Sequence, residues 1–488
     1  MNRANSAARV ILFCLTFVLA LVFSTNKIEE RDFGWLLKTG QVICESHSVP
    51  RTDVYSFTAA GNKYIDSHWL YQVLLYASYR LLGIVGPTLL TAALVLAAFL
   101  MVRRAGYDRE NYVVATALTA AAIVMASERF LVRPHIVTLV FLSAYFLILE
   151  RHQERGTRLI FLLPIMQLLW VNMHGLFALG LILPAVYLAF SLLERRLKLP
   201  MKWSAGKSLE GKSLGALSIV LLVLIGESLV NPYTLDLALY PLTLFKEIRS
   251  DVNVVATSVG ELAAPLASGD LSRSEKLFMW MMCVAALGFL LNLKRLNLTH
   301  LSLFAAFLYL ALTARRNIDL FSVIATPITA VNINMFLNDT CASFKRLDVK
   351  QVFAKVQLAA SPFMIAAMIF LIYQVVTNRY YVSDRDLTRF GVGVAQHAYP
   401  IKASNLVDAA NLGGNMFKEP SDGGYLIWRF YPARRVFFDG RWEVYGDAFF
   451  ENFKALCSDP GRFEEYASAK DIQYALLPHS IPHQERLI

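Results

Sequence analysis

Two acidic residues in the first hundred positions have the surroundings of a catalytic base. Asp32 is followed by an aromatic stretch, Phe33-Gly34-Trp35, and Asp66 lies within the aromatic segment 64–69. A carboxylate in a cavity with cationic neighbours can take a proton from a hydroxyl group. Asp32 also precedes a predicted helix, residues 35–42. Its side chain could cap this helix by accepting a hydrogen bond from a free backbone N–H in the first turn. Taken alone, capping is the commoner role for such an aspartate, so both interpretations stay open.

Four arginines interrupt the apolar runs of the chain at Arg129, Arg133, Arg315 and Arg316. The planar guanidinium group matches the geometry of phosphate oxygens. These side chains could therefore hold the phosphate of a ligand that carries a lipid tail. The alternative is that they bind anionic lipid headgroups or pair with Glu128.

Three further polar residues occur in the same kind of short interruption: His135, Asn172 and His174. Polar groups beside membrane spans are costly and usually mark a pathway or a site. We expect His135, Asn172 and His174 to contact substrate together with Asp66. For His174, a hydrogen-bonded structural role is an equal alternative.

Other motifs favour structural roles or exclude functions. Asp53 is predicted to be a turn residue, and Asp439-Gly440-Arg441 a turn after a strand with a surface ion pair. A catalytic role at Asp439 is the lesser alternative. The five cysteines show no metal-like spacing, although a Cys44–Cys457 disulfide is an option. No P-loop, dinucleotide-binding or zinc motif is present.

The elements that must position these residues are membrane spans. Of 488 residues, 56% are hydrophobic and 17% charged, and the apolar residues come in long runs. A helix needs about 20 residues to cross the hydrocarbon layer, with a range of about 17–25. Eleven spans are predicted, at 8–25, 84–102, 111–127, 130–149, 158–173, 175–193, 214–230, 276–293, 299–313, 317–338 and 357–376.

The cations predict the orientation of these spans. With the N-terminus in the cytoplasm, twenty lysines and arginines fall in the inner loops, against four in the short outer loops. This asymmetry follows the positive-inside rule. The net charge of +10 is therefore a topology signal and not a nucleic-acid footprint. An odd number of spans places the C-terminus outside.

The remaining segments are expected outside the cytoplasm. Residues 26–83 and 231–275 form two large outer loops of a transmembrane domain, residues 1–377, and the stretch 69–82 reads as a helix at the membrane surface. Residues 378–488 have ordinary charge density and many turns, which predicts a small soluble α/β domain. Within it we expect a turn at Gly423-Gly424, a strand ending at Asp439, helices over 446–470 and a strand at 473–477.

The sequence resembles bacterial GT-C-like membrane proteins, a glycosyltransferase-like superfamily, along nearly its whole length. The motifs that carry the resemblance are Asp32-Phe33-Gly34-Trp35, 49–57, His68-Trp69-Leu70, Arg133-Pro134-His135, 170–175, Asn231-Pro232-Tyr233, Ala314-Arg315-Arg316, 423–426 and 436–441. The resemblance implies a polyprenyl-phosphate-linked sugar donor and a site at the outer membrane face. It further implies that Asp32 is the catalytic base and that Arg133, Arg315 and Arg316 hold the lipid phosphate. The first outer loop has Glu29-Glu30-Arg31-Asp32 in place of a clear Asp-Asp or Asp-x-Asp pair, so a divalent metal stays open and no metal ligand is assigned.

The sequence thus predicts a polytopic α-helical membrane protein of GT-C-like architecture in a bacterial inner membrane. The leading hypothesis is a hexosyl- or pentosyltransferase that moves a sugar onto an envelope glycan, lipid or protein acceptor, with membrane lipids as further partners and no nucleic acid. The alternative is a non-catalytic protein that binds lipid-linked glycans or scaffolds envelope polysaccharide synthesis. A transporter ranks last because no internal repeat and no mid-bilayer ionisable residue is found.

Overall fold

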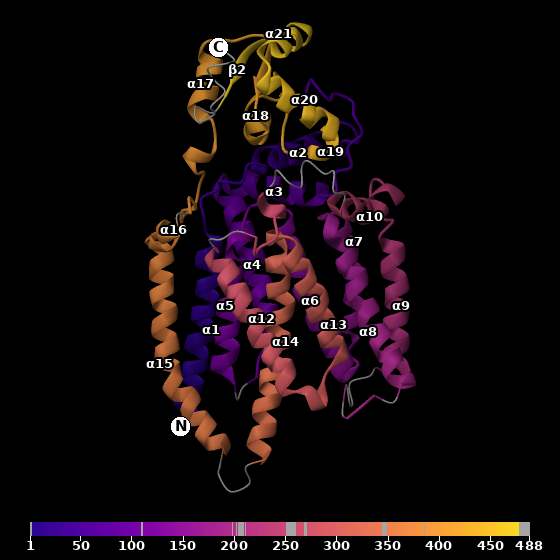
Figure 1. Ribbon diagram of the computed structural model, residues 1–488, viewed down its shortest axis with the longest axis vertical. Helices are drawn as coiled ribbons and strands as arrows, with labels where there is room; N and C mark the ends of the chain where they lie inside the picture. Colours follow the sequence, from indigo (N-terminus) through magenta and orange to yellow (C-terminus); the bar gives the residue numbers. More distant parts are fainter. Residues whose placement is uncertain are drawn as a thin grey trace.

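The computed structural model describes residues 2–108, 111–197, 199–201, 203, 209, 211–249, 260–267, 271–343, 349–384 and 386–477. The predicted cytoplasmic cations Arg109, Lys198, Lys202, Lys207, Lys345 and Arg346 lie outside these residues, as do parts of the second outer loop and residues 478–488. Long helices run side by side through most of the molecule, with the N-terminus at one end of the bundle (Figure 1). Shorter helices and a small sheet cover the opposite end.

Helices occupy the positions of the predicted spans. They are α1 (Asn2–Ser24), α4 (Val85–Gly106), α5 (Tyr112–Ala126), α6 (His135–Arg155), α7 (Leu163–Val171), α8 (Leu179–Arg196), α9 (Gly211–Glu227), α12 (Arg273–Leu291), α13 (Leu298–Thr313), α14 (Ile318–Ser343) and α15 (Val349–Val376). Within the described ranges, eight helices are long and apolar enough to cross a membrane, and two more apolar helices, Arg158–Val171 and Leu298–Thr313, are shorter. The chain is a multi-pass membrane protein; the total of eleven crossings and their orientation stay predictions.

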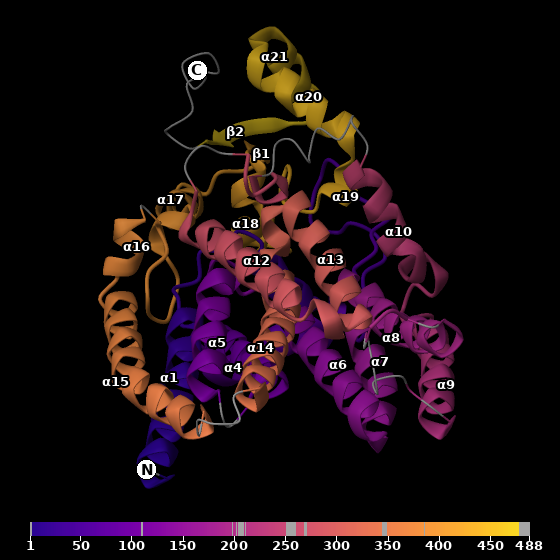
Figure 2. The ribbon, with the colours of Figure 1, turned by 60° about the horizontal axis from the view of Figure 1, so that its bottom comes forward.

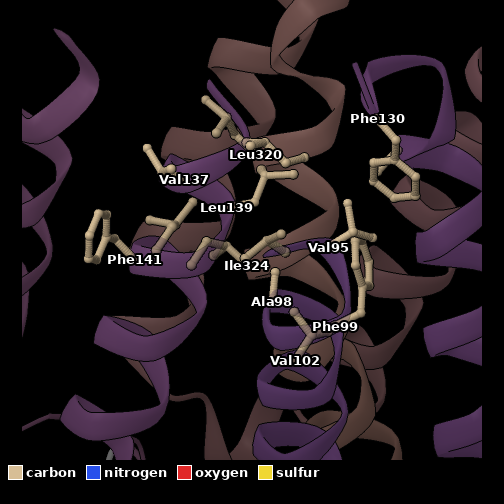
Figure 3. Close-up of a cluster of buried hydrophobic side chains, with 14 of the residues drawn as sticks. Val95, Ala98, Phe99, Val102, Phe130, Val137, Leu139, Phe141, Leu320 and Ile324 are labelled. Atoms are coloured by element: carbon tan, nitrogen blue, oxygen red, sulfur yellow. The ribbon is translucent and has the colours of Figure 1, made fainter. Parts of the chain in front are cut away.

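The core of the bundle forms where α4, α6 and α14 meet. Figure 3 shows side chains of all three helices in one cluster, among them Val95 and Ala98 of α4, Leu139 of α6 and Ile324 of α14. In the apolar stretches of α6 and α14, 78% and 72% of the residues are buried, whereas in that of α15 only 17% are. Helix α15 therefore lies at the edge, where it packs against α1, and α7 to α10 group on the far side of the bundle (Figure 2).

The layer at the other end contains both predicted outer loops and the C-terminal segment. The first loop provides α2 (Phe33–Ser46) and α3 (Trp69–Leu82), which confirms a helix at 69–82, and the second provides α10 (Leu235–Arg249). The C-terminal elements are α16 (Arg379–Ser383), α17 (Ile401–Ala409), β1 (Asn415–Lys418), α18 (Gly423–Phe430), α19 (Trp442–Tyr445), α20 (Asp447–Ser458), α21 (Pro460–Ala469) and β2 (Ile472–Leu476). Strands β1 and β2 pair in parallel.

The C-terminal segment packs closely on the first outer loop. Helix α18 crosses α2 so tightly that a Cβ atom on Gly34 would lie 2.2 Å from the carbonyl oxygen of Gly424. The backbone N–H of Ile28 donates to the carbonyl of Gly393 at 2.8 Å, and that of Val436 donates to the carbonyl of Tyr55 at 2.9 Å. Two segments more than 350 residues apart thus form one layer above the spans.

Several predictions for the tail need correction. Gly423-Gly424 begins a helix and does not form a turn, and residues 431–439 form no strand, although Val436 bridges Ser56. Phe437 and Phe438 instead enter a cluster of aromatic side chains from α20 and α21, so their burial needs no sheet. The predicted helices over 446–470 and the last strand are confirmed.

The ion pair at Asp439 and Arg441 is buried, contrary to the predicted surface pair. Arg441 is 1% exposed, and its Nη2 donates at 2.7 Å to both Asp439 and Asp53. Tyr55 lies beneath the guanidinium with its ring centroid 4.9 Å away. Two carboxylates and an aromatic face can satisfy a buried guanidinium. Asp53 also accepts the N–H groups of Tyr55 and Ser56, which confirms its turn.

The cysteines do not form the optional disulfide. Cys44 and Cys457 are both free thiols, Cys44 on the exposed surface of α2 and Cys457 half-buried in α20. The side chain of Cys341 lies outside the described part of the structure.

Candidate functional site

The predicted site residues gather where the spans meet the layer formed by the first loop and the C-terminal segment. Arg129 is in the short helix η1 (Ser127–Arg129) between α5 and α6, and Arg315 and Arg316 are in η6 (Arg315–Asn317) between α13 and α14. His174 precedes η3 (Gly175–Ala178) and α8, and Asp32 precedes α2. Because successive spans alternate in direction, all these turns lie at the end of the bundle that carries α2 and α18 (Figure 1).

Asp32 is held by partners outside its own helix. Its Oδ1 accepts a hydrogen bond from Trp35 Nε1 at 3.0 Å, and its Oδ2 accepts one from Arg133 Nη2 at 2.7 Å. The capping interpretation is wrong, because the side chain makes no cap hydrogen bond. Asp32 has helical backbone angles (φ −80°, ψ −14°), whereas a capping side chain needs an extended backbone to reach back to the N–H groups.

The C-terminal segment closes over Asp32. A Cβ atom on Gly440 would lie 2.5 Å from Asp32 Oδ1, so Gly440 leaves room only for this carboxylate. The neighbours of Gly440 are Asp439 and Arg441, whose buried ion pair fixes the backbone at this point. The motif 439–441 therefore acts as a rigid support against the side of Asp32.

Arg133 joins three carboxylates from two distant segments. Its Nε lies 2.8 Å from Glu30 Oε2, its Nη2 lies 2.7 Å from Asp32 Oδ2, and its Nη1 lies 2.9 Å from Glu261 Oε1. Burial alone would lower the pKa of Arg133, but the three carboxylates raise it above its ordinary value. Arg133 thus stays protonated and works as a fixed cation at the centre of the group, which we call the Arg133 cluster (Glu30, Asp32, Arg133 and Glu261).

Glu30 and Glu261 of this cluster differ in their electrostatics. Burial raises the pKa of Glu30 to about 7, and the charges of Asp32 and Glu261 add to this, while Arg133 opposes it. For Glu261 burial also raises the pKa, but Arg129 and Arg133 outweigh it and the pKa is lowered. Glu261 binds Arg129 Nη1 at 2.8 Å through its second oxygen, so it bridges two arginines.

Arg316 differs from Arg129, Arg133 and Arg315. Arg315 lies 2.8 Å from Glu275, and Arg129 and Arg133 share Glu261. Among the residues that the structure describes, no carboxylate is within ion-pair distance of Arg316, whose side chain is half-buried. A partly buried cation without a counter-charge is costly, so this guanidinium is suited to an anionic ligand.

His174 lies close to these arginines. Its Nδ1 is 2.8 Å from Thr138 Oγ1, and its ring centroid is 5.7 Å from that of His68. Burial lowers the pKa of His174 well below its ordinary value, and the charges of His68, Arg316 and Arg129 add to this. His174 is therefore neutral near pH 7, with Nε2 left for a further hydrogen bond.

The other predicted substrate contacts are engaged within the protein. His135 Nε2 donates to the carbonyl of Arg129 at 2.6 Å, which fixes the turn that carries this arginine. Asn172 accepts from Trp69 Nε1 at 2.8 Å and donates to two backbone carbonyls. Asp66 is fully buried, and its Oδ1 accepts from the backbone N–H of His68 and from Gln72. The substrate roles of these three residues stay predictions.

The sequence prediction missed Glu30 and Glu261 as site residues. Arg129 is among the four arginines expected to hold a phosphate, because it is one of the few cations in the short loops predicted on the outer side. Glu261 lies 128 residues from its partner Arg133 in a loop of ordinary composition, and nothing in the sequence connects the two.

The described residues do not fit a metal site. They contain no group of three histidine, cysteine or acidic side chains that could hold an ion. The three carboxylates that do converge are already joined by the guanidinium of Arg133.

Comparisons with known proteins identify the fold. No family model and no curated protein matches the chain. The apo oligosaccharyltransferase of Archaeoglobus fulgidus is similar with a TM-score of 0.59 and 12% identity, covering 96% of this chain and 69% of that one. The oligosaccharyltransferase AglB of the same organism, in complex with an inhibitory peptide and a dolichol-phosphate, gives 0.57 and 10%, covering 97% and 69%. The form tethered to an acceptor peptide containing the NVT sequon gives 0.55 and 12%, covering 96% and 68%. The resemblance to GT-C-like membrane proteins is thereby confirmed at the level of the fold.

Proposed function

We propose that this chain is a membrane glycosyltransferase that transfers a sugar from a polyprenyl-phosphate-linked donor to an acceptor hydroxyl or amide. The proposal is carried by two groups at one end of a bundle with the fold of an oligosaccharyltransferase. One is a positioned carboxylate, Asp32, and the other is the guanidinium of Arg316, which has no carboxylate partner among the described residues. A structure of that fold contains dolichol-phosphate, a lipid of the class we propose for the donor.

In the proposed reaction Asp32 acts as the general base. It accepts the proton of the acceptor group while the acceptor atom forms a bond to the anomeric carbon of the donor sugar. The bond between this carbon and the phosphate oxygen breaks, and the polyprenyl phosphate leaves with the electron pair. Fixed cations that face the developing phosphate charge stabilise this transition state.

Arg316 is the proposed principal ligand of the leaving phosphate, with neutral His174 as a further hydrogen-bond donor. Arg133 and Arg315, which the sequence motifs also indicate, would each have to give up a carboxylate partner to bind phosphate. We therefore assign Arg133 a positioning role: with Trp35 it holds Asp32 in one orientation, and Glu30 and Glu261 hold Arg133.

The proposal includes the location of the site. With the N-terminus in the cytoplasm and eleven crossings, the Arg133 cluster lies at the outer face of a bacterial plasma membrane. The segment from residue 378 onward then forms an extracytoplasmic domain that covers the site. The support for this orientation is the cation asymmetry of the loops.

A second candidate function is a non-catalytic protein that binds lipid-linked glycans. The observation that favours it is that both oxygens of Asp32 already accept hydrogen bonds, as those of a structural aspartate would. In that case Arg316 would still bind phosphate, but Asp32 would take no proton.

Complementation separates the two functions. Envelope glycans and glycolipids are compared by mass spectrometry in cells that lack the protein and cells that carry wild type, Asp32→Asn or Asp236→Asn. Asp236 is a matched control, because its carboxylate pairs with Lys63 on the exposed surface. We expect wild type and the control to restore a missing sugar and Asp32→Asn to fail; full restoration by Asp32→Asn would favour the non-catalytic function.

A further inference from the structure

A cavity of about 530 Å³ borders the Arg133 cluster on one side. Its walls come from the end of α1, residues 26–31, the start of α4, the turn 127–133 and residues 380–388. Glu30, Arg133 and Glu261 of the cluster line the cavity, whereas Asp32, Arg316 and His174 do not. Asp32 lies just beyond this lining, because its Oδ2 is 2.7 Å from Nη2 of Arg133. Arg316 and His174, the proposed ligands of the phosphate, are therefore separate from this cavity. The volume of the cavity is within the range of about 300–1,000 Å³ that small-molecule sites occupy.

The cavity has an excess of negative charge. Six carboxylates line it, and only three cations, one of which is Arg133. The carboxylates are Glu29, Glu30, Glu128, Glu261, Asp384 and Asp386.

Two of these carboxylates have no counter-charge. Glu30 and Glu261 pair with Arg133, and Asp384 lies 3.7 Å from Arg273. Glu29 lies 3.9 Å from His397. In the part of the chain that the structure describes, no cation lies within ion-pair distance of Glu128 or Asp386. Both line the cavity, and Asp386 accepts one hydrogen bond there from the backbone N–H of Thr388.

A buried hydroxyl group also points to a ligand. Thr88 of α4 is 1% exposed and lines the cavity, and its Oγ1 has no hydrogen-bond partner among the described residues. A buried polar atom without a hydrogen-bond partner costs free energy. We therefore expect a ligand or a water molecule in the adjoining space to bind it. Phe130 and Tyr381 also line the cavity and contribute aromatic groups. Acceptor oxygens, hydroxyl groups and aromatic surface together suit a molecule with many hydroxyl groups.

We propose that this cavity binds the acceptor, and that the acceptor is a sugar chain that carries no negative charge. Hydroxyl or ammonium groups of a neutral or amino sugar donate hydrogen bonds to the carboxylates. An anionic sugar would place a like charge beside Glu128 and Asp386, which is unfavourable. Besides Arg133, the cations that line the cavity are Lys27 and Arg31, and both are exposed to solvent, so water screens their charge. This inference rests on the proposed function, because it makes the cavity the acceptor side of the same reaction.

Binding of three trisaccharides tests the proposal. The full chain in lipid nanodiscs is titrated, without donor, with maltotriose, fully deacetylated chitotriose and trigalacturonate, and binding is measured by saturation-transfer NMR and calorimetry. We expect the neutral or the amino trisaccharide to bind at least tenfold more tightly than trigalacturonate. Equal or tighter binding of trigalacturonate, or no binding of any of the three, would overturn the proposal.

Variants locate the binding. Thr88→Val keeps the shape and removes the hydroxyl group, and loss of one hydrogen bond lowers the affinity about fivefold. The double variant Glu128→Gln, Asp386→Asn is expected to lose most of the discrimination against trigalacturonate. Asp447→Asn, on the exposed surface of α20, is the matched control and should bind as wild type does. Unchanged binding in both cavity variants would place the sugar elsewhere and refute the proposal.

Asp32→Asn separates failure of this proposal from failure of the proposed function. Binding without donor does not use Asp32 as a base, so this variant should bind the trisaccharide. If Asp32→Asn binds the trisaccharide normally and also keeps full transfer activity, the proposed mechanism fails while the cavity proposal stands. If transfer depends on Asp32 but the acceptor binds independently of Thr88, Glu128 and Asp386, the cavity proposal alone fails.

Discussion

Replacement of Arg133 by methionine tests the Arg133 cluster most directly. The substitution keeps a long side chain but removes the cation that three carboxylates share at 2.7–2.9 Å. Removing one partner of a buried ion pair costs about 3–5 kcal/mol, because the other charge stays behind without compensation. Glu261 is 42% exposed, so water screens its charge, and its interaction with Arg133 contributes at most about 1 kcal/mol to this cost. Glu30, whose pKa is already about 7, can take up a proton and relieve part of the repulsion. We therefore expect Arg133→Met to lower the free energy of unfolding by about 3 kcal/mol, the lower end of this range.

The assay is thermal unfolding of the purified chain in detergent at pH 7.5, combined with a double-mutant cycle. Glu30→Gln removes the carboxylate that suffers most from the loss of Arg133, so the two substitutions together should cost about 1–2 kcal/mol less than their sum. Arg429→Met is the matched control, since Arg429 pairs with Asp408 at the surface, where both are 43% exposed. That pair should contribute less than about 1 kcal/mol. The reasoning is refuted if Arg133→Met costs no more than Arg429→Met, or if the two effects at Arg133 and Glu30 are additive.

Three further outcomes are expected. Gly440→Ala would place a Cβ atom 2.5 Å from Asp32 Oδ1 and displace the carboxylate, so transfer should fall about 10²-fold while unfolding changes by less than about 1 kcal/mol. The pKa of Glu30 is raised from 4.5 to about 7, so the folded state binds its proton more tightly than the unfolded state does. The resulting stabilisation is complete below pH 4.5 and is lost as the pH rises to about 7, a decrease on the order of 3 kcal/mol in the free energy of unfolding. Thermal unfolding of Glu30→Gln should not show this decrease. Dialysis against EDTA should leave transfer and the unfolding temperature unchanged, because Arg133 already joins the converging carboxylates.

Each of these outcomes has a control. Gly413→Ala adds a Cβ atom in open space and should leave transfer unchanged; equal losses in both glycine variants would show that the contact with Asp32 is irrelevant. For Glu30, identical pH profiles of wild type and variant between pH 4.5 and 7 contradict the raised pKa. Transfer that disappears with EDTA and returns with Mg²⁺ or Mn²⁺ would show that the Arg133 cluster is not sufficient.

The spans could be predicted from the sequence because the bilayer imposes a length and an apolar composition on each one. The same reasoning placed Asp32, Arg133, His174 and Arg316 at one end, since loop cations and alternating spans fix which turns lie together. It could not show which groups pair. The partners of Arg133 come from residues 30, 32 and 261, and their convergence depends on the packing of helices far apart in the chain.

The errors have local physical causes. The capping role of Asp32 depends on backbone angles that the residue type does not determine. The apolar run before Asp439 was predicted as a strand, but Phe437 and Phe438 find their contacts among helices, and no neighbouring strand pairs with them in the described structure. The surface ion pair at Arg441 became a buried one because Asp53, almost 400 residues earlier, supplies the second carboxylate.

The hydrogen bonds between residues 25–28 and 389–395 have a consequence for biosynthesis. The backbone of Lys27 donates to Arg389, and that of Ala395 donates to Ile28, so the segment that leads into Asp32 is fastened by residues that follow the last span. A ribosome makes the N-terminal segment first. The loop that carries Asp32 therefore emerges early but waits, without its fastening and without Gly440 beside the carboxylate, until nearly the whole chain is inserted. A nascent chain that ends before residue 389 would contain Asp32, Arg129, Arg133, Arg315 and Arg316 and still lack an assembled site, so the site assembles only after residues 389–440 have been made.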